Sequence, residues 1–290
     1  MKIGIVGVSG YGGSELLRLC AGHPSFELAY VGGESTAGQA LAQRFPALAG
    51  HPAGKLVIQP FAPEKIAGVD LLFVSLPTGK SREPLARVAK NVRLVDVGGD
   101  HRFVAGWTYG LTELPGQRDK IRGASRLANP GCYPAAALLA LAPLVKEGLI
   151  ESEGIVIDAK SGVTGTGRGG ASDFGYAETN EDLFAYGLEA HPHVPEMEKA
   201  LAQVGGRKAT VAFTPHHIGI GFGIPSGAGK HLIERLTLTA DRLQLRYELT
   251  VEDPEYLISP ATYTAMWDHR PDLVPGAPCD PENSERFREE

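Results

Sequence analysis

The chain has 290 residues, of which 43% are hydrophobic, and a formal net charge of −6 at pH 7. A chain of this length can bury a sizeable core, and we expect two domains. The negative charge argues against a general nucleic-acid-binding protein. No apolar run approaches the roughly 18 residues of a membrane helix, and no signal peptide precedes the first predicted strand. We therefore expect a cytoplasmic protein without a nucleic-acid or membrane partner.

Three cysteines, Cys20, Cys132 and Cys279, are spread over the chain. They are too few and too far apart for a disulfide framework or a cysteine zinc site, and an odd number suits a reducing compartment. We expect free thiols, so any chemistry at a cysteine must come from its local setting.

The beginning of the chain combines a short apolar strand, a glycine turn and a helix. Residues 2–7 predict a buried strand, and the helical pattern begins at Ser14. Between them, Gly7, Gly10 and Gly13 have a spacing that lets a pyrophosphate approach the helix N-terminus. The pattern predicts a dinucleotide site; the alternative is a tight turn with no ligand.

A second predicted strand, residues 27–31, ends where such a fold meets the adenosine ribose. Glu34 favours NAD there, because a carboxylate suits a free 2′-hydroxyl, while Ser35 and Thr36 leave NADP open. The alternative for Glu34 is a solvated loop carboxylate.

Two further apolar runs, residues 69–77 and 93–97, predict parallel strands covered on both faces. Residues 79–81 are similar to the end of a phosphate-binding loop, but Val74 occupies the position of its first glycine, so we reject a nucleotide triphosphatase. Alternating strands and helices over roughly the first 130 residues predict an α/β fold with a doubly wound parallel sheet.

Residues 129–139 place Cys132 between turn residues and a strongly helical Ala/Leu run. The positive end of a helix favours the thiolate, which is the form that attacks carbonyl carbons. The alternative is a small core residue that serves packing.

After a strand at residues 155–159, the segment 161–170 is rich in glycine and hydroxyl groups and contains Arg168. Such a donor-rich loop suits a phosphate or carboxylate; the alternative is a plain surface loop. His191 and His193 then precede a helix whose start is marked by Pro195 and Glu196. We favour acid/base chemistry for the histidines over a metal site or a structural role.

The order and spacing of these motifs resemble those of the N-acetyl-γ-glutamyl-phosphate reductase family, which is related to aspartate-semialdehyde dehydrogenase. The resemblance covers Met1 to about His216. The matching segments are residues 7–13, 76–77, 96–102, 109–111, 129–134, 161–165, 191–196 and 213–216.

The resemblance implies a Rossmann domain over residues 1–130, an α+β substrate domain over residues 131–216, and a homo-oligomer, either a dimer or a tetramer. It implies NADP as cofactor, with NAD as the alternative. The implied cofactor-binding residues are Gly7, Ser9, Gly10, Tyr11, Gly12, Gly13, Ser35, Thr36, Leu76 and Pro77. The implied substrate-binding residues are Asn129, Ser161, Gly162 and Arg168.

The implied reaction begins with attack of Cys132 on an acyl phosphate, which gives a thioacyl enzyme and free phosphate. A hydride from NADPH then yields the aldehyde. His191 or His193 would act as general acid/base, and sequence alone leaves the choice open. The implied substrate is N-acetyl-γ-glutamyl phosphate of arginine biosynthesis, with the analogous aminoadipyl phosphate of lysine biosynthesis as the alternative.

Residues 217–290 depart from the family, because its Arg-Gly pair and its Lys-Gly-Ala…Gln-Ala helix do not occur after His216. We expect a substrate-domain sheet without its usual closing strands. Apolar residues alternate on both sides of residues 239–241, which predicts an antiparallel hairpin. From Asp253 onward we expect loops, with a short acidic helix at residues 284–290.

Two other functions remain open at this point. A Cys-His acyl-transfer enzyme or hydrolase would use the nucleophile without a nicotinamide, although the glycine turn argues against it. Alternatively, the altered tail leaves a catalytically impaired dinucleotide-binding protein.

Overall fold

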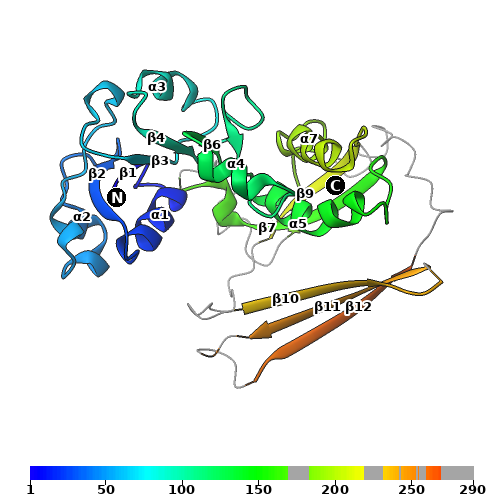
Figure 1. Ribbon diagram of the computed structural model, residues 1–290. Helices are drawn as coiled ribbons and strands as arrows, with labels where there is room; N and C mark the ends of the chain where they lie inside the picture. Colours follow the sequence, from blue (N-terminus) through cyan, green and yellow to red (C-terminus); the bar gives the residue numbers. More distant parts are fainter. Residues whose placement is uncertain (169–182, 219–230, 242, 253, 255–258, 269–290) are drawn as a thin grey trace, which may run out of the picture. The chain divides into compact units, whose positions relative to one another are not determined.

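The computed structural model describes residues 1–168, 183–218, 231–241, 243–252, 254 and 259–268 (Figure 1). The chain forms two units, Met1–Gly219 and Ile220–Glu290. All the motifs with predicted chemistry belong to the first unit. Among the described residues, no helix combines the length and the apolar character that crossing a bilayer requires.

The first unit begins with a six-stranded sheet in which every pairing is parallel. The predicted doubly wound parallel sheet is therefore confirmed. In spatial order its strands are β2 (Glu27–Gly32), β1 (Lys2–Val6), β3 (Leu71–Val74), β4 (Arg93–Asp96), β6 (Arg126–Ala128) and β5 (Thr108–Tyr109).

Both faces of this sheet are covered. Successive side chains of a strand point to opposite sides, and on each side they lie in a buried cluster. Ile3 and Ile5 lie in one buried cluster, and Val6 lies in another with Leu72 and Val74. The covering elements are the helices α1 (Tyr11–Ala21), α2 (Leu41–Arg44), α3 (Arg82–Arg87) and α4 (Gln117–Gly123) and the 3-10 turns η1 (Pro46–Leu48), η2 (Pro52–Lys55) and η3 (Pro63–Lys65).

The strand order places a crevice at the carboxyl ends of β1 and β3. From β1 the chain goes to β2 on one side, and then returns to β3 on the other side of β1. The connections therefore diverge at this point, which is where open α/β sheets bind their ligands.

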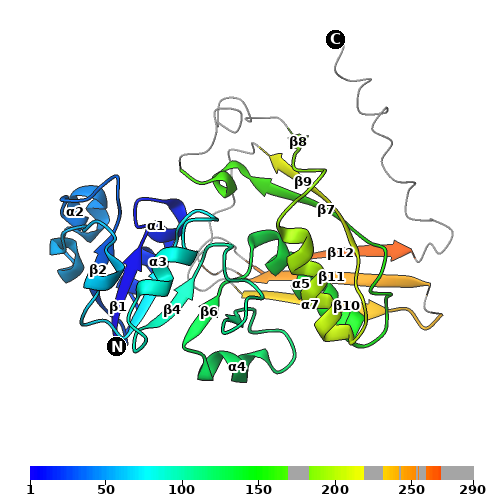
Figure 2. The ribbon, with the colours of Figure 1, turned by 90° about the horizontal axis from the view of Figure 1, so that it is seen from above.

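A second sheet follows, with β7 (Ile155–Gly162) parallel to β9 (Val211–Ile218) and β8 (Leu183–Ala185) antiparallel to β9 (Figure 2). The sequence predicted a loop from Ser161 onward. This was wrong for Ser161 and Gly162, because both still pair with β9 and end the strand. The 3-10 turn η4 (Val163–Thr166) comes directly after them.

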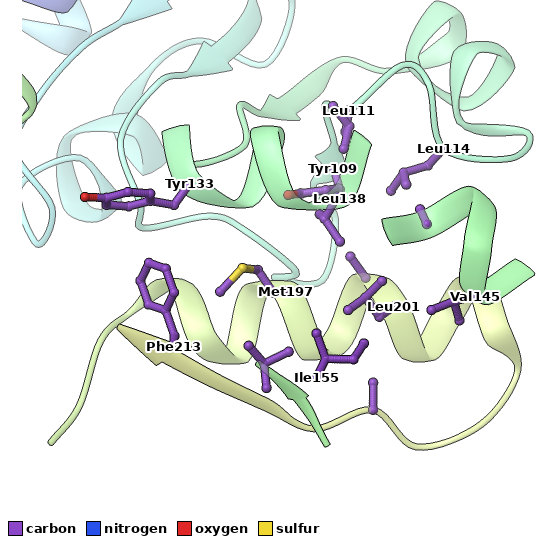
Figure 3. Packing of buried hydrophobic residues seen from close by; sticks show 14 residues of the cluster. Tyr109, Leu111, Leu114, Tyr133, Leu138, Val145, Ile155, Met197, Leu201 and Phe213 are labelled. Atoms are coloured by element: carbon purple, nitrogen blue, oxygen red, sulfur yellow. The ribbon is translucent and has the colours of Figure 1, made fainter. Parts of the chain in front are cut away.

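Two helices, α5 (Cys132–Lys146) and α7 (His193–Gly205), pack against each other over this second sheet. Leu138 of α5 and Met197 and Leu201 of α7 are fully buried between them (Figure 3). Burying each such side chain contributes about 1.5–3 kcal/mol. Ile155 of β7 is buried in the same cluster, whereas Val156 on the other face of the strand is 65% exposed.

The second unit contains an antiparallel three-stranded sheet, β10 (His231–Leu238), β11 (Gln244–Glu252) and β12 (Ala261–Asp268). The predicted hairpin is confirmed, and Asp241 closes its turn by accepting hydrogen bonds from the Thr239 hydroxyl and the Leu243 N–H. The expectation of loops after Asp253 was wrong for β12. The helix expected at residues 284–290 lies outside the described residues.

Candidate active site

A cleft of about 1170 Å³ opens at the crevice beside β1 and β3. The loops after β1, β2, β3 and β4 line it, together with η4 and the start of α7. Ligand sites for small molecules usually enclose about 300–1000 Å³. This cleft therefore has room for a dinucleotide together with a small substrate.

The glycine turn between β1 and α1 forms the floor of one end. Gly7 has a φ of 86°, and a Cβ there would lie 2.0 Å from the Ser75 carbonyl oxygen. A Cβ on Gly13 would lie 2.0 Å from the Gly7 carbonyl oxygen, so neither position accepts a side chain. No side chain caps the first turn of α1, whose cap residue is Gly10. The bare N–H groups fit a pyrophosphate.

Hydroxyl groups gather at the end of β2, where the sequence predicted the adenosine ribose. Ser9 and Thr36 share a hydrogen bond of 2.7 Å, and Ser35 lines the cleft. Glu34 also lines the cleft, but its carboxylate accepts a 3.1 Å hydrogen bond from the Phe61 N–H. The Glu34 carboxylate therefore already accepts a hydrogen bond from the backbone.

Leu76 and Pro77, which the resemblance implies as cofactor-binding residues, lie in the wall of the cleft. Asp100 holds the turn that follows them. The Asp100 carboxylate accepts hydrogen bonds from the backbone N–H groups of Gly79 (2.6 Å) and Ser81 (2.8 Å). Burial raises the pKa of Asp100, but these hydrogen bonds outweigh it and hold the pKa below its ordinary value.

Cys132 is the first residue of α5 and is exposed, so the predicted loop-to-helix setting is confirmed. The loop before it is held on both sides. Arg102 donates to the Asn129 carbonyl oxygen at 2.9 Å, and the Gly131 N–H donates to Glu196 at 2.9 Å. The nucleophile candidate thus stands on a fixed backbone at the positive end of a helix.

The Glu196 carboxylate is a central element of the site that sequence reasoning left without a role. Its side chain is 3% exposed. It accepts hydrogen bonds from Arg102 (2.9 Å), the Tyr109 hydroxyl (2.7 Å) and the Gly131 N–H (2.9 Å). Burial and the charge of Glu196 raise the pKa of Tyr109, which therefore stays a donor. The ion pair with Arg102 joins α7 to the loop after β4, and the hydrogen bond from Gly131 joins α7 to the loop before Cys132.

His191 and His193 lie together, with ring centres 4.7 Å apart. His193 is packed against the residue before Cys132, because a Cβ on Gly131 would lie 2.5 Å from its Nε2. Burial, then the charges of His191 and Arg102, lower the pKa of His193 to about 3. Burial also lowers the pKa of His191. Both rings are neutral near pH 7 and can accept a proton.

Two tyrosines that the sequence did not single out complete the surroundings of Cys132. The Tyr186 hydroxyl donates to the Tyr133 hydroxyl at 3.3 Å, and Tyr133 donates to the His216 carbonyl oxygen at 3.0 Å. Burial, then the hydrogen bond to Tyr133 and the electrostatic interactions with Tyr133 and Cys132, raise the pKa of Tyr186. Tyr186 is therefore a protonated donor near the sulfur.

The four predicted substrate residues lie in different settings. The Asn129 amide donates a hydrogen bond to the Pro130 carbonyl oxygen, and the Ser161 hydroxyl donates one to the Gly162 carbonyl oxygen. None of these residues lines the cleft. Arg168 does line it, but its guanidinium lies over the ring of Tyr11. Cys132 and His191 lie outside the lining, whereas His193, Arg102 and Glu196 belong to it.

The histidine pair does not form part of a larger metal-ligand cluster in the described ranges. No group of three or more His, Cys, Asp or Glu residues there could hold a metal ion.

Comparisons with known proteins agree with this geometry. Residues 2–124 match the family model described as semialdehyde dehydrogenase, NAD binding domain, and residues 132–255 match the semialdehyde dehydrogenase dimerisation domain. A protein named N-acetyl-gamma-glutamyl-phosphate reductase from a Bradyrhizobium species is 54% identical over 227 residues, which are 77% of this chain and 68% of that protein.

The chain belongs to the N-acetyl-γ-glutamyl-phosphate reductase family. A relative of the same name from Brevibacillus brevis is 39% identical and aligns with 89% of this chain and 79% of its own length. The dimerisation-domain match also continues past His216 to residue 255. The family likeness therefore reaches into β10 and β11, beyond the point where the sequence motifs placed its end.

Solved structures support the fold. Aspartate semialdehyde dehydrogenase II from Vibrio cholerae, solved in complex with ASA, has a TM-score of 0.57 at 13% identity, covering 87% of this chain and 74% of its own. The Candida albicans aspartate semialdehyde dehydrogenase, solved with NADP, also has a TM-score of 0.57, at 14% identity, covering 87% of this chain and 71% of its own. The family and its structural neighbours are semialdehyde dehydrogenases, so the chain belongs among these oxidoreductases.

Proposed function

We propose that the protein reduces N-acetyl-γ-glutamyl phosphate to N-acetylglutamate semialdehyde and phosphate, with NADPH as hydride donor. The observation that carries this proposal is the setting of Cys132. It is an exposed cysteine at a helix N-terminus, on a loop that Glu196 and Arg102 hold, and His193 packs against Gly131, the residue before it. The same unit contains the glycine turn.

The first step is acyl transfer to sulfur. The Cys132 thiolate forms a bond to the acyl carbon, the bond from that carbon to the phosphate oxygen breaks, and phosphate leaves with the electron pair. The positive end of α5 stabilises the thiolate, and the protonated Tyr186 hydroxyl is a nearby donor.

His193 is the better candidate for the acid/base residue. Burial lowers the pKa of His193 and so weakens it as a base, which means that its candidacy rests on its position next to the residue before Cys132. Its ring packs against Gly131, and it lines the cleft, which His191 does not. This supports His193 where the sequence left the two histidines equivalent.

The cofactor end of the cleft supports NADP. When bound, NADPH supplies the hydride that converts the thioester to an aldehyde. Glu34 is engaged by the Phe61 N–H, while Ser9, Ser35 and Thr36 offer hydroxyl groups where a 2′-phosphate would lie. A carboxylate reserved for a free 2′-hydroxyl would instead favour NAD.

The substrate end supports an anionic acyl phosphate, because Arg102 and Lys199 both line the cleft there. The relatives named N-acetyl-gamma-glutamyl-phosphate reductase favour the N-acetylglutamyl group, which would place the reaction in arginine biosynthesis. The dimerisation-domain match supports a homodimer. A cytoplasmic location would keep the nucleophilic thiol reduced.

The reverse reaction tests the proposal. Purified protein is mixed with N-acetylglutamate semialdehyde, phosphate and NADP, and the absorbance of NADPH is followed. We expect a steady rate that requires phosphate and is absent in Cys132→Ser. Dinucleotide binding without turnover would instead identify a catalytically impaired binding protein. Ester hydrolysis without a dinucleotide would indicate an acyl-transfer enzyme.

A further inference from the structure

An arginine from the segment after β7 lies on the glycine turn between β1 and α1. Arg168 follows the η4 turn, and its guanidinium carbon lies 4.4 Å from the centre of the Tyr11 ring. Tyr11 is the first residue of α1, directly after Gly10. All three residues line the same cleft. The segment after β7 therefore reaches the place where the backbone N–H groups of α1 are bare.

The guanidinium of Arg168 is available to an anion. Within the described part of the chain, no carboxylate forms an ion pair with it, and the residue is exposed. A planar guanidinium that stacks on an aromatic face keeps its N–H donors free around its edge. These donors match two phosphate oxygens in a bidentate arrangement.

We propose that Arg168 binds the pyrophosphate of the nicotinamide dinucleotide, with the ring of Tyr11 holding its guanidinium in position. This inference rests on the proposed function. It assigns Arg168 to the cofactor, whereas the sequence resemblance implied a substrate-binding role. The N–H groups of α1 bind the pyrophosphate from one side and Arg168 from the other, so the glycine turn and the segment after β7 hold the same ligand.

The position of Tyr11 selects the pyrophosphate over the 2′-phosphate. Tyr11 follows β1 and begins α1, where a dinucleotide places its pyrophosphate. The adenosine ribose belongs to the end of β2, where Ser35 and Thr36 lie. NADP and NAD contain the same pyrophosphate, so loss of a contact to it should weaken the binding of both dinucleotides by the same factor.

Calorimetric titration of the full chain with NADP and with NAD tests the proposal. Arg168→Ala should raise the Kd for both dinucleotides by the same factor, roughly tenfold, because a bidentate charged contact is lost. Arg168→Lys should raise the Kd values less, since lysine keeps the positive charge but lacks the paired N–H donors of the guanidinium. Arg18→Ala is the matched control. Arg18 is an exposed residue of α1 that pairs with Glu15, so its loss should leave both Kd values unchanged.

The ring of Tyr11 gives a second, independent variant. Tyr11→Phe keeps the aromatic face and should raise the Kd less than Tyr11→Leu does. Tyr11→Leu removes the face and should raise the Kd about threefold. In the Arg168→Ala background, Tyr11→Leu should have no further effect, because the cation that the ring holds is already absent.

Several results would overturn the proposal. An increase in Kd for NADP alone would assign Arg168 to the 2′-phosphate. Unchanged Kd values with a raised KM for the semialdehyde would assign it to the substrate. If the wild-type chain bound neither dinucleotide, the proposed function would fail and this inference with it, whereas normal wild-type binding with unchanged Arg168→Ala binding refutes only this inference.

Discussion

Replacing Glu196 with glutamine should release the loop that carries Cys132. The carboxylate accepts hydrogen bonds from Arg102, Tyr109 and Gly131, and its side chain is 3% exposed. A glutamine of the same size offers one acceptor oxygen and turns an N–H₂ group toward one of these donors. It also leaves the charge of Arg102, whose side chain is 14% exposed, without its counter-ion.

The magnitude follows from these contacts. Hydrogen bonds to a charged group contribute about 1.5–3 kcal/mol each, and breaking a buried ion pair costs about 3–5 kcal/mol. Because glutamine keeps one acceptor and Arg102 reaches some solvent, we expect Glu196→Gln to lower the free energy of unfolding by about 3 kcal/mol. That is a large part of the roughly 5–15 kcal/mol that stabilises a typical domain.

Urea denaturation followed by circular dichroism measures this loss. Glu113→Gln is the matched control, because Glu113 is an exposed carboxylate and its replacement should change stability by less than about 0.5 kcal/mol. Tyr109→Phe should couple to Glu196→Gln in a double-mutant cycle, since the two side chains share a hydrogen bond. If Glu196→Gln were as stable and as active as the wild type, the role given to this carboxylate would be refuted.

Three further predictions concern single residues. Cys132→Ser should abolish turnover and change stability by less than about 0.5 kcal/mol, because the side chain is exposed; a normal rate would remove the sulfur from the reaction. The pKa of His193 falls from 6.5 to about 3 on folding, so the folded state binds fewer protons and stability decreases as the pH falls below 6.5. Relative to pH 8, this group should cost about 2 kcal/mol at pH 5, and His193→Gln should show a correspondingly flatter pH profile in urea denaturation. Asp100→Asn should lose about 1–3 kcal/mol at pH 7, where the carboxylate of the wild type is charged, and the loss should shrink as the pH falls toward the pKa of Asp100; an equal loss at pH 3 would contradict the assignment.

The parts of the fold that local signals determine were accessible from the sequence. The strand, glycine turn and helix at Gly7 to Gly13 lie within one short segment, and the helix after Gly131 follows from an Ala/Leu run behind turn residues. Apolar runs likewise predicted the parallel strands. These signals need no knowledge of which distant segments meet.

The network around Cys132 could not be predicted in the same way. Gly131 and Glu196 are 65 positions apart, and Arg102 and Glu196 are 94 positions apart. Their contacts depend on how α7 packs against α5, which no local pattern specifies. The placement of Arg168 on Tyr11 depends on the same long-range packing.

Strand β12 shows a different cause of error. Its residues alternate between small or aromatic residues and Thr or Met, as a strand requires, and Tyr, Thr and Trp favour strands. The Pro-rich and charged segments on both sides led to the prediction of loops. The alternation of Ala261, Tyr263, Ala265 and Trp267 was the signal that could have identified it.

A single-turnover experiment tests most directly whether Cys132 carries the acyl group beside the cofactor. The protein is mixed with N-acetylglutamate semialdehyde and NADP in the absence of phosphate, and NADPH and the protein mass are measured together. We predict a burst of about one NADPH per chain and an acyl adduct on the peptide that contains Cys132, because the thioester then has no phosphate to accept its acyl group. No burst, or an adduct on any other residue, would contradict the account.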